Sequence, residues 1–261
     1  MPAARMSESI LHRPGPSEDV DPSCVVVAGA SGGIGGALCR EIATVYPAVT
    51  LVRLARSPDR LESLPCRTLD IGLDICEEAR IEQAVARIPD PLTVDWALVA
   101  TGWLHDSHFS PEKSLRHLNA EHLQHAYLVN AIGPALLSKA LVARLNPKAT
   151  PRIGILSARV GSISDNRLGG WHAYRASKAA LNMLIRNFAL ELARRKNHPI
   201  IVGLQPGTTD TALSKPFQRN VPEGQLQTPQ YTAAQLVKVM QALQPQDSGG
   251  LFDFLGLPFA P

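Results

Sequence analysis

A glycine-rich turn between an apolar run and a helical run constrains the fold of this chain more than any other feature. The run Cys24–Ala28 (CVVVA) is apolar and mostly β-branched, which is typical of a strand buried on both faces. The segment 29–36 (GASGGIGG) follows, and ALCREIATV then has helical periodicity. Glycine allows a tight turn from strand to helix, and the N–H groups at a helix start attract an anion. The feature predicts a strand–turn–helix unit that binds a phosphate group.

The rest of the chain repeats this alternation of strands and helices. Apolar runs typical of strands cover residues 24–28, 49–54, 66–69, 94–100, 152–157, 199–204 and 250–254. Helical periodicity covers residues 34–46, 77–88, 119–145, 171–196 and 228–243. Strands that alternate with helices form a parallel sheet covered on both faces. We therefore predict an α/β fold of the Rossmann type, with a doubly wound, mostly parallel sheet of seven strands and helices on both faces.

The same pattern predicts how the chain is divided. Residues 1–20 carry three prolines and no periodicity, so we expect a flexible N-terminal extension outside the fold. Residues 21–261 are expected to form a single domain. The longest connection without a structural pattern is 205–227, which follows the sixth strand. We interpret it as a lid over a ligand site, with an ordinary surface loop as the alternative.

Composition and charge narrow the environment and partners. Hydrophobic residues make up 45% of the chain and charged residues 19%, which suits a large buried core. No apolar run has the length of a signal sequence or a membrane-spanning helix, so we expect a cytoplasmic protein without a membrane partner. The net charge of +3 is dispersed, which argues against nucleic acid as a partner.

Cysteine and histidine spacing does not favour a metal site. The four cysteines, at positions 24, 39, 66 and 76, lack a CxxC spacing, and we expect them to be reduced and structural. The histidine pairs His105/His108 and His122/His125 have i, i+3 spacing but lack a third ligand at a matching position. We therefore expect no metal.

A tyrosine and a lysine one helical turn apart carry the chemistry. Tyr174 and Lys178 form a YxxxK pair in the helical segment 171–196, and their spacing places both side chains on one face. A nearby ammonium favours the phenolate, so we expect it to bring the tyrosine pKa toward working pH for acid–base catalysis. Such a pair can give a proton to, or take one from, a reacting oxygen. A YxxxK pair alone is frequent, and two solvated surface residues are the alternative.

Together, the glycine turn and the YxxxK pair resemble those of short-chain dehydrogenases/reductases over roughly residues 24–255. The turn resembles TGxxxGIG, with Ala28 in place of the usual threonine. The resemblance implies an NAD(P)H-dependent oxidoreductase in which Tyr174 is the acid/base and Lys178 also binds the nicotinamide ribose. It further implies that Asn130 completes a water-linked proton relay, whereas a polar side chain satisfied within a long helix is the alternative.

The resemblance also implies a set of cofactor-binding residues. The adenine is assigned to Asp74 in LDIGLDICEE, with Asp70 as the less favoured register. The family's NNAG segment corresponds to VATG in a degenerate form, and its PGxxxT segment begins at the Pro-Gly pair after the sixth strand. Besides Tyr174 and Lys178, the implied cofactor-binding residues are Gly29, Ser31, Gly33, Ile34, Gly35, Asp74, Ala100, Gly102, Pro206, Gly207, Thr209 and Thr211.

The serine that orients the substrate carbonyl in this family has no direct match. Alignment of SSxxG on residues 157–161 puts Ala158 at the catalytic position. Ser157 is the favoured substitute and Ser162 the alternative. Trp103 and Trp171 are candidates for the substrate pocket, as is His172, for which a solvated position near the helix start is the alternative.

The residues after the second strand predict the cofactor. An enzyme that selects NAD commonly has a carboxylate there, whereas this chain has Ala55 and Arg56. A guanidinium suits a ribose 2′-phosphate, so we predict NADP(H), with NAD(H) as the alternative. A solvated arginine at the strand end is the other interpretation.

The wider string SARVGSISDNRLGGWHAYRASKAALN resembles the branch that contains C-factor signalling proteins and sniffer-type carbonyl reductases. The resemblance implies reduction of a ketone or aldehyde, a small-molecule substrate, to an alcohol. A C-factor-like NAD(P)-binding signalling or sensor protein is the alternative function. We also expect a homodimer or homotetramer formed through the helices 119–145 and 171–196, as in relatives.

Overall fold

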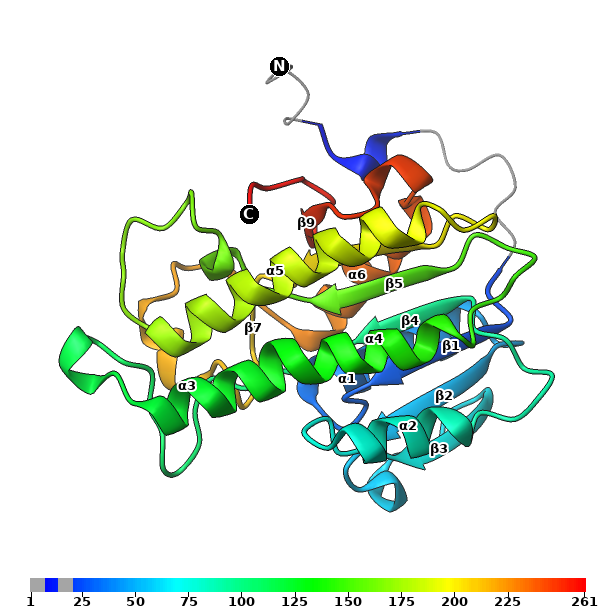
Figure 1. Cartoon of the computed structure of the whole chain (residues 1–261), viewed down its shortest axis with the longest axis horizontal. Coiled ribbons are helices and arrows are strands. Elements are labelled where there is room, and N and C mark those ends of the chain that lie inside the picture. Colours follow the sequence, from blue (N-terminus) through cyan, green and yellow to red (C-terminus); the bar gives the residue numbers. More distant parts are fainter. Residues whose placement is uncertain (1–7, 14–20) are drawn as a thin grey trace.

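The computed structural model describes residues 8–13 and 21–261. Seven strands form one sheet in the order β3-β2-β1-β4-β5-β6-β9, and every pairing in it is parallel (Figure 1). This confirms the doubly wound α/β fold. The strands are β1 Cys24–Ala28, β2 Thr50–Ala55, β3 Arg67–Gly72, β4 Trp96–Val99, β5 Arg152–Leu156, β6 Ile200–Gln205 and β9 Leu251–Asp253.

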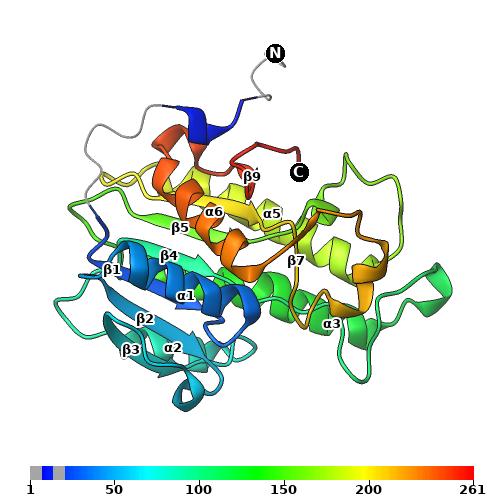
Figure 2. The ribbon, with the colours of Figure 1, turned by 180° about the vertical axis from the view of Figure 1, so that it is seen from behind.

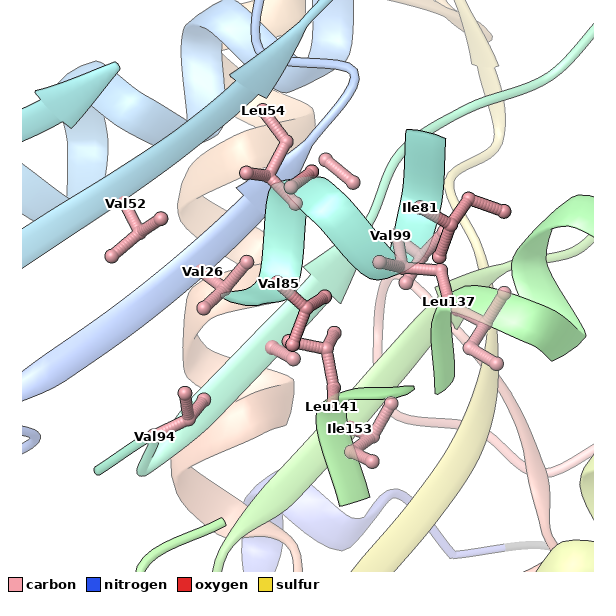
Figure 3. Packing of buried hydrophobic residues seen from close by; sticks show 14 of the residues in the cluster. Val26, Val52, Leu54, Ile81, Val85, Val94, Val99, Leu137, Leu141 and Ile153 are labelled. Carbon is pink, nitrogen blue, oxygen red and sulfur yellow. The ribbon is translucent and has the colours of Figure 1, made fainter. Parts of the chain in front are cut away.

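Helices cover both faces of the sheet, and each face has its own core. Side chains of a strand alternate between faces, so Val26 packs into one core while Val25 and Val27 pack into the other. The face with Val26 is covered by α2, α4 and α5 (Figure 1), and the opposite face by α1 and α6 (Figure 2). Figure 3 shows Ile81 and Val85 of α2 and Leu137 and Leu141 of α4 packed in the core on the Val26 side. The α-helices are α1 Gly33–Val45, α2 Glu78–Ala86, α3 Ala120–Tyr127, α4 Gly133–Val142, α5 His172–Leu192 and α6 Pro229–Ala242.

The strand order reverses direction between β1 and β4. The chain runs outward from β1 through β2 to β3, and then returns to the other side of β1 with β4. The loops that follow β1 and β4 therefore diverge and leave a crevice at the carboxyl ends of these strands. The described chain also contains short 3₁₀ helices: η1 Ile10–His12, η2 Pro58–Arg60, η3 Leu115–His117, η5 Arg159–Gly161, η6 Lys215–Asn220 and η7 Pro245–Asp247.

The predicted helix 119–145 is not continuous. A π-helical segment, η4 Leu128–Ile132, lies between α3 and α4. Pro134 lacks the N–H that an α-helix would direct at the carbonyl of Asn130, so the regular hydrogen-bond pattern cannot continue through this point. Gly133 adds a second reason for the irregularity, because a Cβ on it would lie 2.4 Å from the backbone oxygen of Ile75.

Residues 8–13, which lie within the predicted N-terminal extension, pack against the fold. Ile10 is fully buried in the core beneath α6, and its N–H donates to the carbonyl of Gly256 at 3.0 Å. Arg13 forms an ion pair with Asp247 at 2.7 Å. A helix of three residues is too short to show a periodicity, which is why the sequence pattern gave no signal. The rest of the predicted extension lies outside the described residues.

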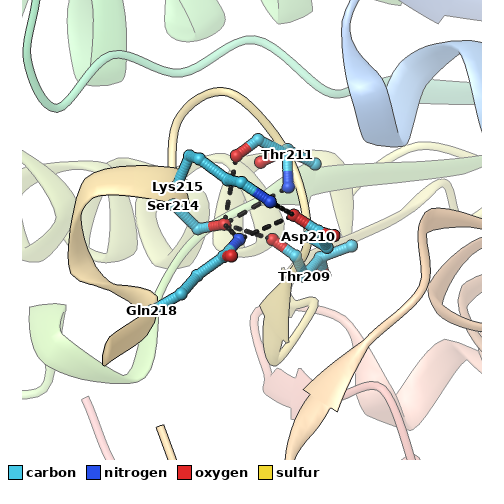
Figure 4. A network of polar contacts seen from close by, with 6 residues as sticks. All are labelled: Thr209, Asp210, Thr211, Ser214, Lys215 and Gln218. Carbon is cyan, nitrogen blue, oxygen red and sulfur yellow. Dashed lines mark hydrogen bonds and ion pairs between the residues drawn. The ribbon is translucent and has the colours of Figure 1, made fainter. Parts of the chain in front are cut away.

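The segment 205–227, predicted as a loop without regular structure, is ordered by short elements. Strand β7 Thr208–Thr209 pairs with β8 Leu226–Gln227, and η6 lies between them. Asp210 accepts a hydrogen bond from Gln218 at 2.8 Å and pairs with Lys215 at 3.3 Å (Figure 4).

Among the described residues, no helix is long and apolar enough to cross a membrane.

Candidate active site

Two adjoining cavities occupy the crevice at the carboxyl ends of the strands. The first, here called the catalytic cavity, has a volume of about 440 Å³ and contains Tyr174, Lys178 and Ser157 in its lining. The second, the β2 cavity, has a volume of about 380 Å³ and lies beside the end of β2. Both are lined by Gly32, Arg56, Ala100, Thr101, Gly102 and Trp103.

Helix α5 places Tyr174 and Lys178 on the same side, as their spacing predicts. The Nζ atom of Lys178 lies 5.9 Å from the centre of the Tyr174 ring. Lys178 is buried, and its Nζ donates a hydrogen bond to the carbonyl of Leu156, at the end of β5, at 2.8 Å. Its position is fixed from behind by Gly161, where an added Cβ would lie 2.7 Å from the Lys178 Cβ.

Burial determines the titration of both groups. Loss of solvation raises the pKa of Tyr174 to about 12 and lowers the pKa of Lys178 to about 8. The expectation that the tyrosine pKa is brought toward working pH is therefore wrong, because desolvation moves it upward. At neutral pH the phenol keeps its proton and the amine is mainly charged.

Ser157 lies in the catalytic cavity, whereas Ser162 does not. Ser157 follows β5, is buried, and donates a hydrogen bond from its Oγ to Oδ1 of Asn182 at 2.6 Å. Ser162 lines a different cavity, together with His172. The sequence interpretation missed Asn182, although it continues the series 174, 178, 182 at intervals of four residues along one helical face.

Asn130 lies behind the cavities instead of in their walls. Its amide clamps the backbone of Trp103, accepting from the N–H and donating to the carbonyl, each at 2.8 Å. It also donates to the hydroxyl of Ser177 at 3.1 Å. An added Cβ on Gly102 would lie 3.9 Å from Asn130 Oδ1 and 4.0 Å from Lys178 Nζ. The asparagine therefore fixes the strand-end loop against which Lys178 is placed.

The glycine turn brings backbone against backbone. Gly29 has φ +81°, and a Cβ on it would lie 2.9 Å from the carbonyl oxygen of Ala100. Gly35 is buried beneath the turn, where a Cβ would lie 2.0 Å from the oxygen of Gly29. Only glycine fits these two positions, so the turn is held tightly at the start of α1.

The exposed side of the turn faces the two cavities. Gly33 and Ile34 line the catalytic cavity, and Gly29 and Ser31 line the β2 cavity. An added Cβ on Gly33 would lie 2.6 Å from the methyl of Thr211, so the segment after β6 reaches the turn from the opposite side.

The two candidate aspartates have different surroundings. Asp70 lies within β3 and forms two hydrogen bonds with Arg53, at 2.7 and 2.6 Å, which makes it part of the sheet. Asp74 follows β3 and lines the β2 cavity, where its Oδ1 accepts from the N–H of Cys76 at 2.9 Å. Arg56, at the end of β2, is exposed and lines both cavities.

The segment after β6 contributes fewer lining residues than predicted. Pro206 and Thr211 line the catalytic cavity. Gly207 instead borders a separate cavity, and the hydroxyl of Thr209 is buried against that of Thr232 at 2.9 Å. Gly207 and Thr209 therefore shape this segment without reaching either cavity.

Several lining residues come from loops that have no sequence motif. Leu104, His105, Ala212 and Leu213 line the catalytic cavity, and Nε2 of His105 lies 3.1 Å from the carbonyl of Leu213. Of the three pocket candidates, Trp103 lines both cavities and the ring of Trp171 lies 6.3 Å from that of Tyr174. The third candidate, His172, faces another cavity. Within the described residues, no three His, Cys, Asp or Glu side chains gather in a way that could hold a metal ion.

Comparison with known protein families identifies the family to which this chain belongs. The model of the short chain dehydrogenase family matches residues 23–222. The chain belongs to this family. It is 30% identical over 230 residues to 1-hydroxy-2-glutathionyl-2-methyl-3-butene dehydrogenase of Rhodococcus sp. (strain AD45), covering 87% of this chain and 94% of the relative. It is also 34% identical over 130 residues to C-signal of Myxococcus xanthus, covering 50% of this chain and 73% of the relative.

Solved structures show the same fold. NADPH-bound carbonyl reductase from chicken fatty liver superposes with a TM-score of 0.79 at 23% identity, covering 93% of this chain and 100% of that protein. Carbonyl reductase Sniffer of D. melanogaster superposes with a TM-score of 0.78 at 20% identity, covering 92% and 99%. This short-chain oxidoreductase therefore has the predicted architecture across nearly its whole length.

Proposed function

We propose that this short-chain oxidoreductase reduces a ketone or aldehyde to an alcohol with NADPH, and that Tyr174 donates the proton. The observation that carries the proposal is the convergence of Tyr174, Lys178 and Ser157 on one cavity that adjoins the β2 cavity. A dinucleotide needs such a pair of connected spaces, one for each end. When bound, the cofactor supplies the hydride that the carbonyl carbon receives.

The residues that line the two cavities fit a nicotinamide dinucleotide. The glycine turn at the start of α1 offers N–H groups to a pyrophosphate. We propose that Asp74, which lines the β2 cavity, binds the adenine and that Lys178, which lines the catalytic cavity, binds the nicotinamide ribose. The Oγ1 of Thr101, which lines both cavities, is buried without a hydrogen-bond partner among the described residues. Such an atom gains from a ligand that supplies a partner.

The proton chemistry follows from the state of each side chain. Tyr174, with a pKa of about 12, holds a proton that it can give to the oxygen of the reduced carbonyl. Lys178 then lies beside the phenolate that remains, and its charge stabilises that anion. The hydroxyl of Ser157 turns from Asn182 to the carbonyl oxygen and polarises it. The carbon gains a hydride and the oxygen a proton, which gives the alcohol.

The test is consumption of NADPH, followed by its absorbance, with a panel of ketones and aldehydes. Wild-type protein should turn over at least one class of carbonyl. Tyr174→Phe should abolish turnover and leave NADPH affinity nearly unchanged, because the ring and its packing remain. Turnover by Tyr174→Phe within a few-fold of wild type on any accepted substrate would falsify the assigned role.

The choice of NADPH over NADH rests on Arg56. Its guanidinium borders both cavities at the end of β2, and no ion pair joins it to another described residue. It is therefore available for a 2′-phosphate. Arg56→Ala should lower kcat/KM for NADPH by roughly tenfold or more, the size of a charge-assisted hydrogen bond, and barely change it for NADH. Equal losses with both cofactors would remove Arg56 from the site.

The C-signal relative supports signalling as a second candidate function. We propose that in this case the protein would bind NAD(P) and signal without a need for turnover. Tyr174, Lys178 and Ser157 together in one cavity favour the enzyme. A wild-type protein that binds NADPH but reduces nothing in the panel would favour signalling.

A further inference from the structure

Helix α5, which carries Tyr174, begins without a cap of its own. Its N-cap residue, Trp171, has a left-handed backbone (φ 50°, ψ 43°) and makes no side-chain capping hydrogen bond. The first turn contains no acidic residue. Ser, Thr, Asp or Asn usually occupies an N-cap, because the first N–H groups of a helix have no partner within it. The start of this helix therefore needs acceptors from elsewhere in the chain.

Those acceptors come from one buried glutamate, 61 residues earlier in the sequence. Glu112 lies in the loop between β4 and α3 and is 2% exposed. Its two carboxylate oxygens accept from the N–H of Ala173 at 3.2 and 3.3 Å. Its backbone carbonyl accepts from the N–H of Trp171 at 2.6 Å. Glu112 thus caps α5 with both its side chain and its backbone, at the end of the helix where a negative charge is stabilised.

The glutamate is held in place from its other side. Nδ1 of His122, on α3, lies 3.3 Å from Glu112 Oε1, and His122 is also buried. The ring of Phe109 stacks on that of His122 with a centroid distance of 5.0 Å. A carboxylate packed in this way cannot turn toward solvent, so its position fixes the position of the helix start.

Tyr174, which lines the catalytic cavity, and the neighbouring Trp171 depend on that position. Tyr174 is the next residue after Ala173, whose N–H is capped, so the cap also fixes the backbone of Tyr174. The ring of Trp171 lies 6.3 Å from that of Tyr174 and 5.0 Å from that of Phe217 in η6. The loop that supplies Glu112 also supplies Trp103 to the cavity lining. One residue therefore links the substrate-facing loop to the catalytic helix.

We propose that Glu112 is a positioning residue for the reaction: it caps α5 from a distant loop and sets where Tyr174 stands in the catalytic cavity. This inference rests on the proposed function. Glu112 lines neither the catalytic cavity nor the β2 cavity, so we do not expect it to contact substrate or cofactor. Its effect on turnover passes through the placement of Tyr174, so it should appear in kcat and not in cofactor affinity.

Two substitutions of Glu112 distinguish an effect on the position of Tyr174 from a general loss of stability. Glu112→Ala removes both capping oxygens of the side chain. Glu112→Gln keeps the shape and one acceptor oxygen, and it also serves if the alanine variant fails to fold. Thr228→Ala is the matched control, because Thr228 caps α6 through a 3.2 Å hydrogen bond from Tyr231, on the opposite face of the sheet. Both alanine variants lose one helix cap, and a purely structural role predicts similar effects for both.

The experiment measures kcat, KM, the Kd of NADPH and the melting temperature for the full chain. Glu112→Ala should lower kcat by about 10- to 100-fold, as expected for a misplaced catalytic group, with the Kd of NADPH unchanged. Glu112→Gln should recover most of that loss. Thr228→Ala should lower the melting temperature and leave kcat unchanged. A kcat for Glu112→Ala as close to wild type as that of Thr228→Ala would overturn the inference.

Amide hydrogen exchange separates failure of this inference from failure of the proposed function. In Glu112→Ala, amides of residues 171–175 should exchange faster than in wild type, while those in the second half of α5 should not change. Unchanged exchange in the first turn would overturn the cap itself. Faster exchange in a protein that reduces no carbonyl would instead show that the proposed function is wrong.

Discussion

Burial acts in opposite directions on the two titrating side chains of the catalytic cavity. It raises the pKa of Tyr174 to about 12, because the charged form of tyrosine, the phenolate, loses solvation there. It lowers the pKa of Lys178 to about 8, because the charged form of lysine, the ammonium, also loses solvation. The pair is therefore most stable at neutral pH as a neutral phenol beside a charged amine. That is the state that a proton donor for carbonyl reduction needs before the reaction.

The serine at the end of β5 allows a direct test. Ser157→Ala should lower kcat by roughly 100-fold, since loss of one hydrogen-bond donor to a developing oxyanion has about this effect. Ser162→Ala, the matched control, should leave kcat within about two-fold of wild type, because Ser162 lines another cavity. A large loss in Ser162→Ala alone would reverse the assignment, and no loss in either variant would mean that the site works without a serine. Steady-state kinetics with an accepted carbonyl decides between these outcomes.

Residues were predictable from sequence where their chemistry depends on local spacing. Tyr174 and Lys178 share a face because i and i+4 always do on a helix, and Asn182 could have been found by the same rule. Glu112 could not, since its partner Ala173 is 61 positions away and a lone glutamate before a helix carries no motif. Its importance comes from a buried contact that only the fold creates.

At the scale of elements, the helix at 119–145 shows how a local signal can be present and still be outweighed. Pro134 lies within the predicted helix and marks a break, yet the apolar periodicity continues on both sides of it. In the structure, the π-helical segment η4 interrupts the α-helix before Pro134, and α3 and α4 continue the helix on either side. The π segment holds Asn130 so that its amide reaches the backbone of Trp103. Such segments are frequent at functional sites for this reason.

The short helix η1 gives a prediction at the same scale. Ile10 is fully buried against the core of α6, so Ile10→Ala should lower the free energy of unfolding by about 2–5 kcal/mol. Leu115→Ala is the matched control, because Leu115 is 76% exposed and its truncation should change stability by less than about 0.5 kcal/mol. Urea unfolding followed by circular dichroism measures both. A midpoint for Ile10→Ala equal to that of Leu115→Ala would show that η1 does not contribute to the fold.

For the whole molecule, the alternation of strands and helices determined most of the architecture in advance. A parallel sheet needs crossover helices, and right-handed crossovers on both sides of β1 leave a crevice where the order reverses. The loops that close this crevice follow no such rule, because their sequences need only fit one another and a substrate. For that reason His105 and Leu213, which meet across the catalytic cavity, could not be predicted.

Self-association is the remaining prediction at this scale. Helix α5 buries Leu181 and Ile185 against the sheet, yet Met183 is 63% exposed and Leu190 is 55% exposed on its outer side. We propose that this outer face packs against a second copy, giving a homodimer or homotetramer. In a two-fold interface, each substitution occurs once on each copy, and the two substituted residues lie close together. A charge introduced there therefore loses solvation and is also repelled by the same charge on the other copy.

Light scattering at micromolar concentration should therefore give a mass near a multiple of the 28.1 kDa of one chain. The double variant Met183→Lys, Leu190→Lys should shift the mass to that of one chain, because two lysines per copy would have to be buried in the interface. Val45→Lys provides the control, since Val45 is 41% exposed on α1, which covers the opposite face of the sheet. A wild-type mass near one chain would contradict self-association. A double variant with the wild-type mass would place the interface on another face.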